Sequence, residues 1–162
     1  KEIRRTLRIR EGDPLEIYTD REGEVILKKY SMIGDIGQFA KQYADALSQT
    51  TGYLVIVTDR DMVIAASSGV KKDMVGKHIS RELEKAALDR KIILTDSSKK
   101  EFCRVADDME GDYIEAIAPI ICNGDVAGSI VFLNKNTERK FGETEQKMIA
   151  VAASFLGKQM EG

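Results

Sequence analysis

Five basic side chains lie within the first ten residues, and they are the strongest chemical feature of the sequence. Lys1, Arg4, Arg5, Arg8 and Arg10 face a single acid, so this decapeptide carries a net charge of +4. Guanidinium groups bind phosphates bidentately and read guanine edges, which suits the cluster to a polyanion. A solvated, charged helix face is the alternative interpretation of the same pattern.

The net charge of the whole chain hides this cluster. The 162 residues carry 25 Lys and Arg against 27 Asp and Glu, a formal net charge of −2. Residues 31–162 alone carry 17 basic and 20 acidic side chains, a net charge of −3. A basic N-terminal segment therefore precedes a mildly acidic remainder.

Residues suited to catalysis or metal binding are few and scattered. The one histidine, His78, cannot form a multi-histidine metal site and lies in a predicted surface turn. Cys103 and Cys122 lie in a predicted loop and a predicted hairpin turn, and we interpret them as reduced thiols of a cytosolic protein. The paired carboxylates lack the spacing of an acid–base pair or a metal cage. We therefore predict no catalytic residues, no metal site and no enzyme.

Arg104 is the candidate ligand-binding residue in the middle of the chain. It lies in a long polar connection over residues 96–111, where it could meet an anionic ligand if that connection lines a pocket. An ordinary surface arginine is the alternative. No cofactor is predicted, and the identity of any small effector is left open.

Residues 1–30 predict a short helix followed by a β-hairpin. Ile3 and Leu7 are four residues apart, so the first seven residues have one apolar helical face. Residues 15–20 and 24–29 are strand-like runs on either side of a turn that contains Gly23. About 30 residues cannot bury a stable core alone, so this segment needs a partner.

Residues 31–162 predict an α+β domain with a central antiparallel sheet. Asp35 and Ser80 are the expected N-caps of two helices. The first and last helices are expected on one face of the sheet, with apolar surfaces wide enough to meet a second subunit as well. The expected elements are helices over about 35–50, 81–88 and 143–160, and strands over 53–59, 62–66, 91–95, 113–121 and 125–134.

The N-terminal 30 residues resemble the second half of the AbrB-type swapped-hairpin DNA-binding domain. The resemblance rests on the helix KEIRRTL, the strand beginning GDPLEI and the closing LKKY. It implies that two chains exchange hairpins into a small dimeric β-barrel. By position, Arg4 and Arg5 match the paired arginines of the family and are the implied DNA contacts, with Lys1 and Arg8 as further contacts. The family's first strand has no counterpart here, so we expect residues before Lys1 to supply it in the natural protein.

The remainder is similar to the GAF domain, a small sensory fold. The similarity is one of pattern, carried by LVIVTDRD and by NGDVAGSIVF before the last helix. It implies the sensing of a small effector between the sheet and the loops around residues 67–80 and 97–113. A domain that serves assembly alone is the alternative. Some GAF-like domains resemble a methionine-sulfoxide reductase with loop cysteines, so a thiol-dependent enzyme is one alternative.

Together these features predict a cytoplasmic, nucleoid-associated transcriptional regulator. Its partners would be double-stranded DNA and further copies of itself, as a dimer through the N-terminal segment or a tetramer through the terminal helices of the remainder. No stretch reaches the ~18 apolar residues of a membrane helix. A second alternative is an antitoxin, because swapped-hairpin domains also occur with toxin partners. Antitoxins usually continue as a disordered tail, whereas this chain is patterned throughout.

Overall fold

The computed structural model describes residues 9, 11, 15–29 and 33–161. The chain divides into two compact units, Lys1–Met32 and Ile33–Gly162, which we call the head and the body. The helix expected over residues 1–7, with its arginines, lies outside the described residues.

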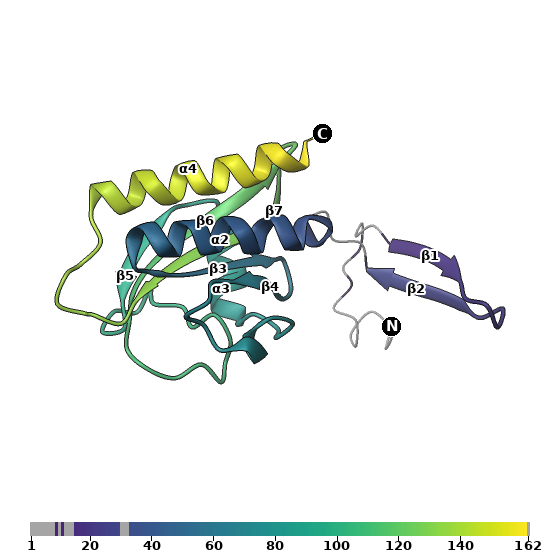
Figure 1. Ribbon diagram of the computed structural model, residues 1–162, viewed down its shortest axis with the longest axis horizontal. Coiled ribbons are helices and arrows are strands. Elements are labelled where there is room, and N and C mark those ends of the chain that lie inside the picture. Colours follow the sequence, from purple (N-terminus) through teal and green to yellow (C-terminus); the bar gives the residue numbers. More distant parts are fainter. Residues whose placement is uncertain (1–8, 10, 12–14, 30–32, 162) are drawn as a thin grey trace. The chain divides into compact units, whose positions relative to one another are not determined.

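The described part of the head is an antiparallel hairpin of strands β1 (Leu15–Thr19) and β2 (Val25–Lys29) (Figure 1). Asp20 holds its turn, because Oδ1 accepts hydrogen bonds from two backbone N–H groups at 2.9 and 3.0 Å. Gly23 has a φ of +84°, which costs glycine little because it has no Cβ. The hairpin and its glycine turn are as predicted.

One face of this hairpin is apolar, and its described side chains are exposed. Ile17 lies directly opposite Leu27, so both side chains project from the same face. Ile17 and Val25 are 69% and 68% exposed, and Leu15 and Leu27 are also exposed. An isolated two-stranded hairpin is marginal in water, so this face needs a cover to be stable.

The body contains a five-stranded antiparallel sheet in the order β4-β3-β7-β6-β5. The two longest strands are joined by the turn Asn123-Gly124, whose φ angles are +50° and +85°. Positive φ at both central residues is what a tight type I′ hairpin requires, as the sequence predicts. The strands are β3 (Leu54–Asp59), β4 (Val63–Ala66), β5 (Ile93–Asp96), β6 (Ile114–Cys122) and β7 (Asp125–Asn134).

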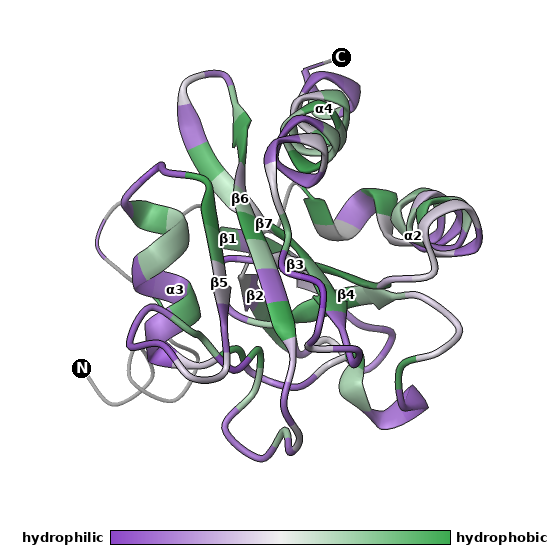
Figure 2. Cartoon of the chain, turned by 90° about the vertical axis from the view of Figure 1, so that its left-hand side faces the viewer, coloured by the Kyte–Doolittle hydropathy of each residue, from purple (hydrophilic) through white to green (hydrophobic). Residues whose placement is uncertain are grey.

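Helices cover both faces of the sheet (Figure 2). The first and last helices of the body, α2 and α4, lie on one face as predicted, and α3 lies on the other. Each face therefore has its own apolar core, with Phe132 buried in the first and Ile117 in the second. The helices are η1 (Ile33–Ile36), α2 (Gly37–Thr51), η2 (Lys72–Met74), α3 (Arg81–Leu88) and α4 (Glu143–Met160).

The two predicted helix caps have different outcomes. The Ser80 hydroxyl accepts a hydrogen bond from the backbone N–H of Leu83 at 3.1 Å, so Ser80 caps α3 as predicted. The prediction for Asp35 is wrong. Asp35 lies within the 3-10 turn η1, and the residue before α2 is Ile36, which has no side-chain cap.

Candidate regulatory site

Glu115 is a buried acid near the start of strand β6. Its side chain is fully buried. Tyr113, just before the strand, and Ile117 within it belong to the core beneath α3, and alternation along the chain puts Glu115 on that same face. One carboxylate oxygen, Oε1, accepts a hydrogen bond from the backbone N–H of Cys103 at 2.8 Å. Glu115 thereby fixes the polar connection over residues 97–113 to the sheet.

The environment of Glu115 favours its neutral form. Burial raises the pKa of Glu115 to about 8, while the hydrogen bond from Cys103 and the charge of Arg104 act in the opposite direction. An ionised carboxylate is strongly disfavoured in an apolar environment unless it is paired. Strongly shifted pKa values of this kind are common at functional sites, and they also occur in structural networks of charged groups.

Thr95 stands beside Glu115 on the neighbouring strand β5. The two residues are direct partners in the antiparallel register, so their side chains share one face of the sheet. Thr95 is buried as well. Glu115 Oε2 and Thr95 Oγ1 have no hydrogen-bond partner among the described residues.

Arg104 organises the connection over residues 97–113. Its Nη1 donates hydrogen bonds to the carbonyl oxygens of Met109 and Gly111, both at 3.0 Å. Its guanidinium also lies over the ring of Phe102, 5.5 Å from the ring centroid. The Ser80 hydroxyl, which caps α3, donates in turn to the carbonyl oxygen of Arg104. The connection is thus tied to α3, to the sheet and to itself, and the predicted role of Arg104 in ligand binding stays a prediction.

Both cysteines are buried thiols rather than activated nucleophiles. Burial, together with the charges of Glu115 and Glu82, raises the pKa of Cys103 to about 12. Burial also raises the pKa of Cys122. A catalytic thiol instead needs a lowered pKa, because the thiolate is the nucleophile.

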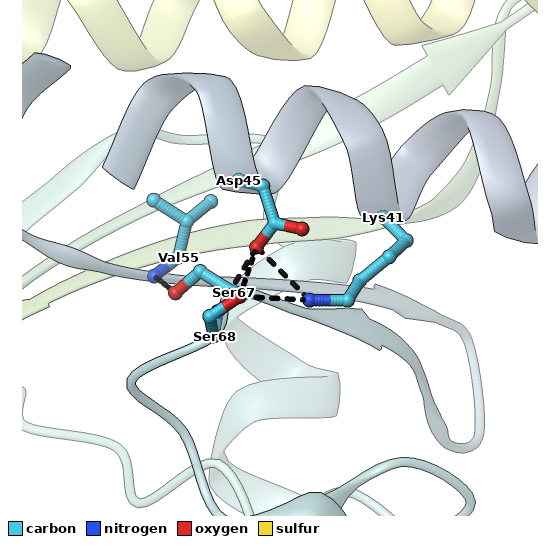
Figure 3. Close-up of polar contacts among 5 residues, drawn as sticks. All are labelled: Lys41, Asp45, Val55, Ser67 and Ser68. Carbon is cyan, nitrogen blue, oxygen red and sulfur yellow. Dashed lines mark hydrogen bonds and ion pairs between the residues drawn. The ribbon is translucent and has the colours of Figure 1, made fainter. Parts of the chain in front are cut away.

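A polar cluster on α2 joins this helix to the loop that follows β4 (Figure 3). Asp45 Oδ1 accepts hydrogen bonds from the backbone N–H and the hydroxyl of Ser68, at 2.9 and 3.1 Å. Lys41, one turn earlier, pairs with the same oxygen at 2.9 Å. The hydroxyl of Ser67 accepts a hydrogen bond from the backbone N–H of Val55 in β3. The loop at residues 67–70, one of those expected to border an effector, is therefore fixed to α2.

The outer surface of α2 and α4 carries a cluster of aromatic rings. Phe155 of α4 lies 6.0 Å from Phe39 and 5.2 Å from Tyr43 of α2, measured between ring centroids. Phe39, Phe155 and Val151 are all exposed. The two helices therefore share an apolar surface left over after the sheet is covered, as expected for helices that also meet a second subunit.

The predicted site residues divide between the two units. Lys1, Arg4, Arg5 and Arg8 lie outside the described residues, and Arg104 lies 11 residues before Glu115 in the connection that Glu115 anchors. Our reading of the sequence missed Glu115 itself. The signal was an acid within the otherwise apolar run of residues 113–121, which indicates a buried charge.

Two further features of the described chain bear on metal and membrane binding. Carboxylate oxygens of Asp20, Glu22 and Glu24 lie within 4.8 Å of one another at the exposed hairpin turn. Exposed acidic turns of this kind are common without a metal ion, and we assign none. None of the helices among the described residues has the length and apolar character needed to cross a bilayer.

Comparison with known proteins separates the same two parts of the chain. Residues 35–161 match the family described as "Stage V sporulation protein T C-terminal, transcription factor". Residues 1–35 match the family described as "Antidote-toxin recognition MazE, bacterial antitoxin". The chain is 48% identical over 162 residues to stage V sporulation protein T of Bacillus subtilis (strain 168), an alignment that covers 99% of this chain and 89% of that protein.

Solved structures confirm the GAF-like fold of the body. The GAF domain of a phosphoenolpyruvate-protein phosphotransferase from Acinetobacter superposes with a TM-score of 0.62 at 13% identity, covering 82% of this chain and 83% of that one. A type II free methionine-R-sulfoxide reductase from Thermoplasma acidophilum superposes with a TM-score of 0.60 at 14% identity, covering 79% and 94%. At such identities the likeness concerns the fold alone.

Proposed function

The chain belongs to the stage V sporulation protein T family of transcription factors, and we propose that it regulates sporulation genes by binding double-stranded DNA as a homo-oligomer. The similarity to a transcription factor along nearly the whole chain carries this proposal. It favours neither alternative, because the antitoxin description applies to residues 1–35 and the likeness to a reductase is one of fold. The protein would then act in the cytoplasm, at the nucleoid.

The head is the proposed DNA-binding unit. The uncovered apolar face of its hairpin supports pairing with the head of a second chain, because a partner would remove Ile17 and Val25 from water. Arg4 and Arg5 are the proposed contacts to phosphates and guanine edges, with Lys1 and Arg8 as additional phosphate contacts.

The body is the proposed second association surface. The exposed rings of α2 and α4, together with Val151, support contact between two bodies. If the two surfaces join the same two chains, the protein is a dimer. If they join different chains, the heads link two body dimers into a tetramer.

The body is also the proposed effector-responsive unit. The connection over residues 97–113 and the loop at residues 67–70 border opposite parts of the sheet, and Asp45 joins the second loop to α2. A ligand that prefers one arrangement of these segments would shift the population of that arrangement, and the polar link through Asp45 would pass the change to α2.

DNA binding by the full chain tests the proposed function. The preferred sequence is first selected from a random double-stranded pool and then titrated by fluorescence anisotropy. Arg4→Ala and Arg5→Ala should each weaken binding by about 1–3 kcal/mol, and raising the salt concentration should weaken wild-type binding strongly. Arg139→Ala, at an exposed position of the body, is the matched control. Failure to select any sequence, or wild-type affinity for both head variants, would contradict the proposal.

A further inference from the structure

Two buried oxygen atoms on one face of the sheet lack protein partners. Glu115 Oε2 and Thr95 Oγ1 lie on neighbouring strands at directly opposed positions, and neither has a partner among the described residues. Buried polar groups in native proteins are almost always hydrogen-bonded, and each exception needs an explanation. The other oxygen of Glu115 is already occupied by the backbone N–H of Cys103. Two buried polar oxygen atoms without partners are therefore left on directly opposed residues, and they are a pair of acceptors for a cation when Glu115 is ionised.

The surroundings of these acceptors are apolar. Leu133 of β7 stands opposite Glu115 in the sheet register, and Ile117 follows Glu115 on the same face. Leu83 of α3 packs into the same core. A ligand suited to this place has a donor group at one end and an aliphatic body. A primary ammonium group supplies three donors and a positive charge, and it satisfies a carboxylate and a hydroxyl together.

We infer that the body binds a small primary alkylammonium compound, with its nitrogen between Glu115 and Thr95 and its aliphatic part against the core beneath α3. This inference rests on the proposed role of the body as an effector-responsive unit, and it assigns the chemical class of that effector. Neither a carboxylate nor an alcohol of equal length would serve. The first would repel the ionised form of Glu115 that the ammonium pairs with, and the second would bring a single donor and no charge.

Entry of the ligand requires the connection over residues 97–113 to move. Glu115 is fully buried in this structure, and the connection that covers it contains neither helix nor strand. The ligand nitrogen would bind Oε2, whereas the Cys103 N–H is bound to Oε1 of the same carboxylate, so opening of the connection to admit the ligand would break the hydrogen bond from Cys103. The connection would then be loosened at Cys103, whose buried thiol lies next to the broken hydrogen bond. Ligand binding should therefore expose Cys103 to a thiol reagent.

Charged groups around Glu115 make the binding pH-dependent. Arg104 in the connection, the Cys103 thiol and Glu82 of α3 are the ionisable groups linked electrostatically to this site. Burial raises the pKa of Glu115 to about 8, whereas the ammonium needs the ionised carboxylate. The apparent affinity should therefore rise with pH between 6 and 8 as the cost of removing the proton falls.

The test uses the full chain with Cys122→Ser, so that Cys103 is the only thiol. n-Pentylammonium chloride is titrated calorimetrically at pH 8, with n-pentanol as the neutral probe, and the reaction of Cys103 with Ellman's reagent is followed at each concentration.

Saturable binding of n-pentylammonium should accompany an increase of at least fivefold in the Cys103 reaction rate. Glu115→Gln keeps an acceptor for the Cys103 N–H and should weaken binding at least tenfold, while Thr95→Val should weaken it less. Glu101→Gln, an exposed change in the same connection, should have no effect.

Three results would overturn the inference: no saturable binding of n-pentylammonium, equal binding of n-pentanol, or unchanged binding by both Glu115→Gln and Thr95→Val. Thermal unfolding of each variant shows whether it is folded, and Thr95→Val tests the site if Glu115→Gln is not. DNA affinity is measured on the same preparations. Retained DNA binding without ammonium binding would reject this inference alone, whereas loss of DNA binding by the wild type would reject the proposed function.

Discussion

The hairpin of the head and the sheet of the body are both antiparallel, but they treat their apolar side chains in opposite ways. In the body, Phe132 and Ile117 are fully buried between the sheet and its helices. In the head, Ile17 and Val25 remain about two-thirds exposed. The strands of the body thus complete a core, whereas the hairpin of the head leaves one apolar face exposed.

This difference shows where the chain depends on other molecules. The body buries its own core, part of which comes from the connection over residues 97–113. A hairpin with an open apolar face becomes stable only through association. Coupling folding of the head to assembly fits the DNA-binding role proposed for this unit.

The largest loss of unfolding free energy should come from a substitution in the core of the body. Phe132→Ala removes a fully buried ring and should lower the free energy of unfolding by about 3–5 kcal/mol, since the cavity adds to the lost burial. Phe155→Ala removes a ring that is 40% exposed and should cost only about 1 kcal/mol. Urea unfolding followed by circular dichroism at one protein concentration measures both. Similar losses for the two variants would contradict the division between core and outer surface.

The second largest change in the free energy of unfolding should come from ionisation of the buried Glu115, and it should depend on pH. The pKa of Glu115 is about 8 in the folded protein and about 4.3 in an unfolded chain, so the folded state binds the proton more tightly. The stabilisation is therefore complete below the unfolded pKa and is lost as the pH rises toward 8. Between pH 5 and 7.5 the free energy of unfolding should fall by about 3 kcal/mol.

Glu115→Gln is the control for this pH dependence, because an amide cannot ionise. Its urea unfolding curve should move little between pH 5 and 7.5. The acids of lowered pKa, Asp45, Asp96 and Asp108, lose their contributions only as the pH falls below about 4. If Glu115→Gln showed the same pH dependence of unfolding as the wild type, this pH dependence would come from another group.

Local patterns were sufficient to predict most of the fold. The strand expected over residues 125–134 is β7 at the same bounds, because alternation and the Asn123-Gly124 turn are both local signals. The cap at Ser80 is likewise local. The prediction that Asp35 is an N-cap failed because a 3-10 turn takes the place of the first α-helical turn there. The capping pattern in the sequence does not distinguish these two kinds of turn.

The candidate site could not be predicted in the same way. Thr95 and Glu115 meet through a strand register that spans 20 residues of sequence, and the contact of Phe155 with Phe39 joins the two ends of the body. Such pairs depend on tertiary packing, which local propensity does not contain. The DNA contacts at Arg4 and Arg5 rest on family resemblance and stay predictions.

A smaller effect should come from the polar link between α2 and the loop after β4. Asp45→Ala removes the acceptor for both hydrogen bonds from Ser68 and should lower the free energy of unfolding by more than a change at an exposed ion pair does. Asp73→Ala is the matched control, because its carboxylate is 70% exposed and lies 3.6 Å from Lys77, a geometry worth little. Equal urea midpoints for the two variants would show that the link to α2 contributes nothing to stability.

The smallest effect on the body should come from the head. Ile17→Ala alters an exposed side chain of the separate unit and should change the free energy of unfolding of the body by less than about 0.5 kcal/mol. The same variant should weaken association through the head, because the methyl groups it removes are those that a second hairpin would cover. Glu22→Ala, in the exposed turn, should change neither property. Light scattering across a dilution series, beside urea unfolding, separates the two effects. If Ile17→Ala left association unchanged, the exposed face of the hairpin would not be the surface that joins two heads. If it destabilised the body instead, the two units would not be energetically independent.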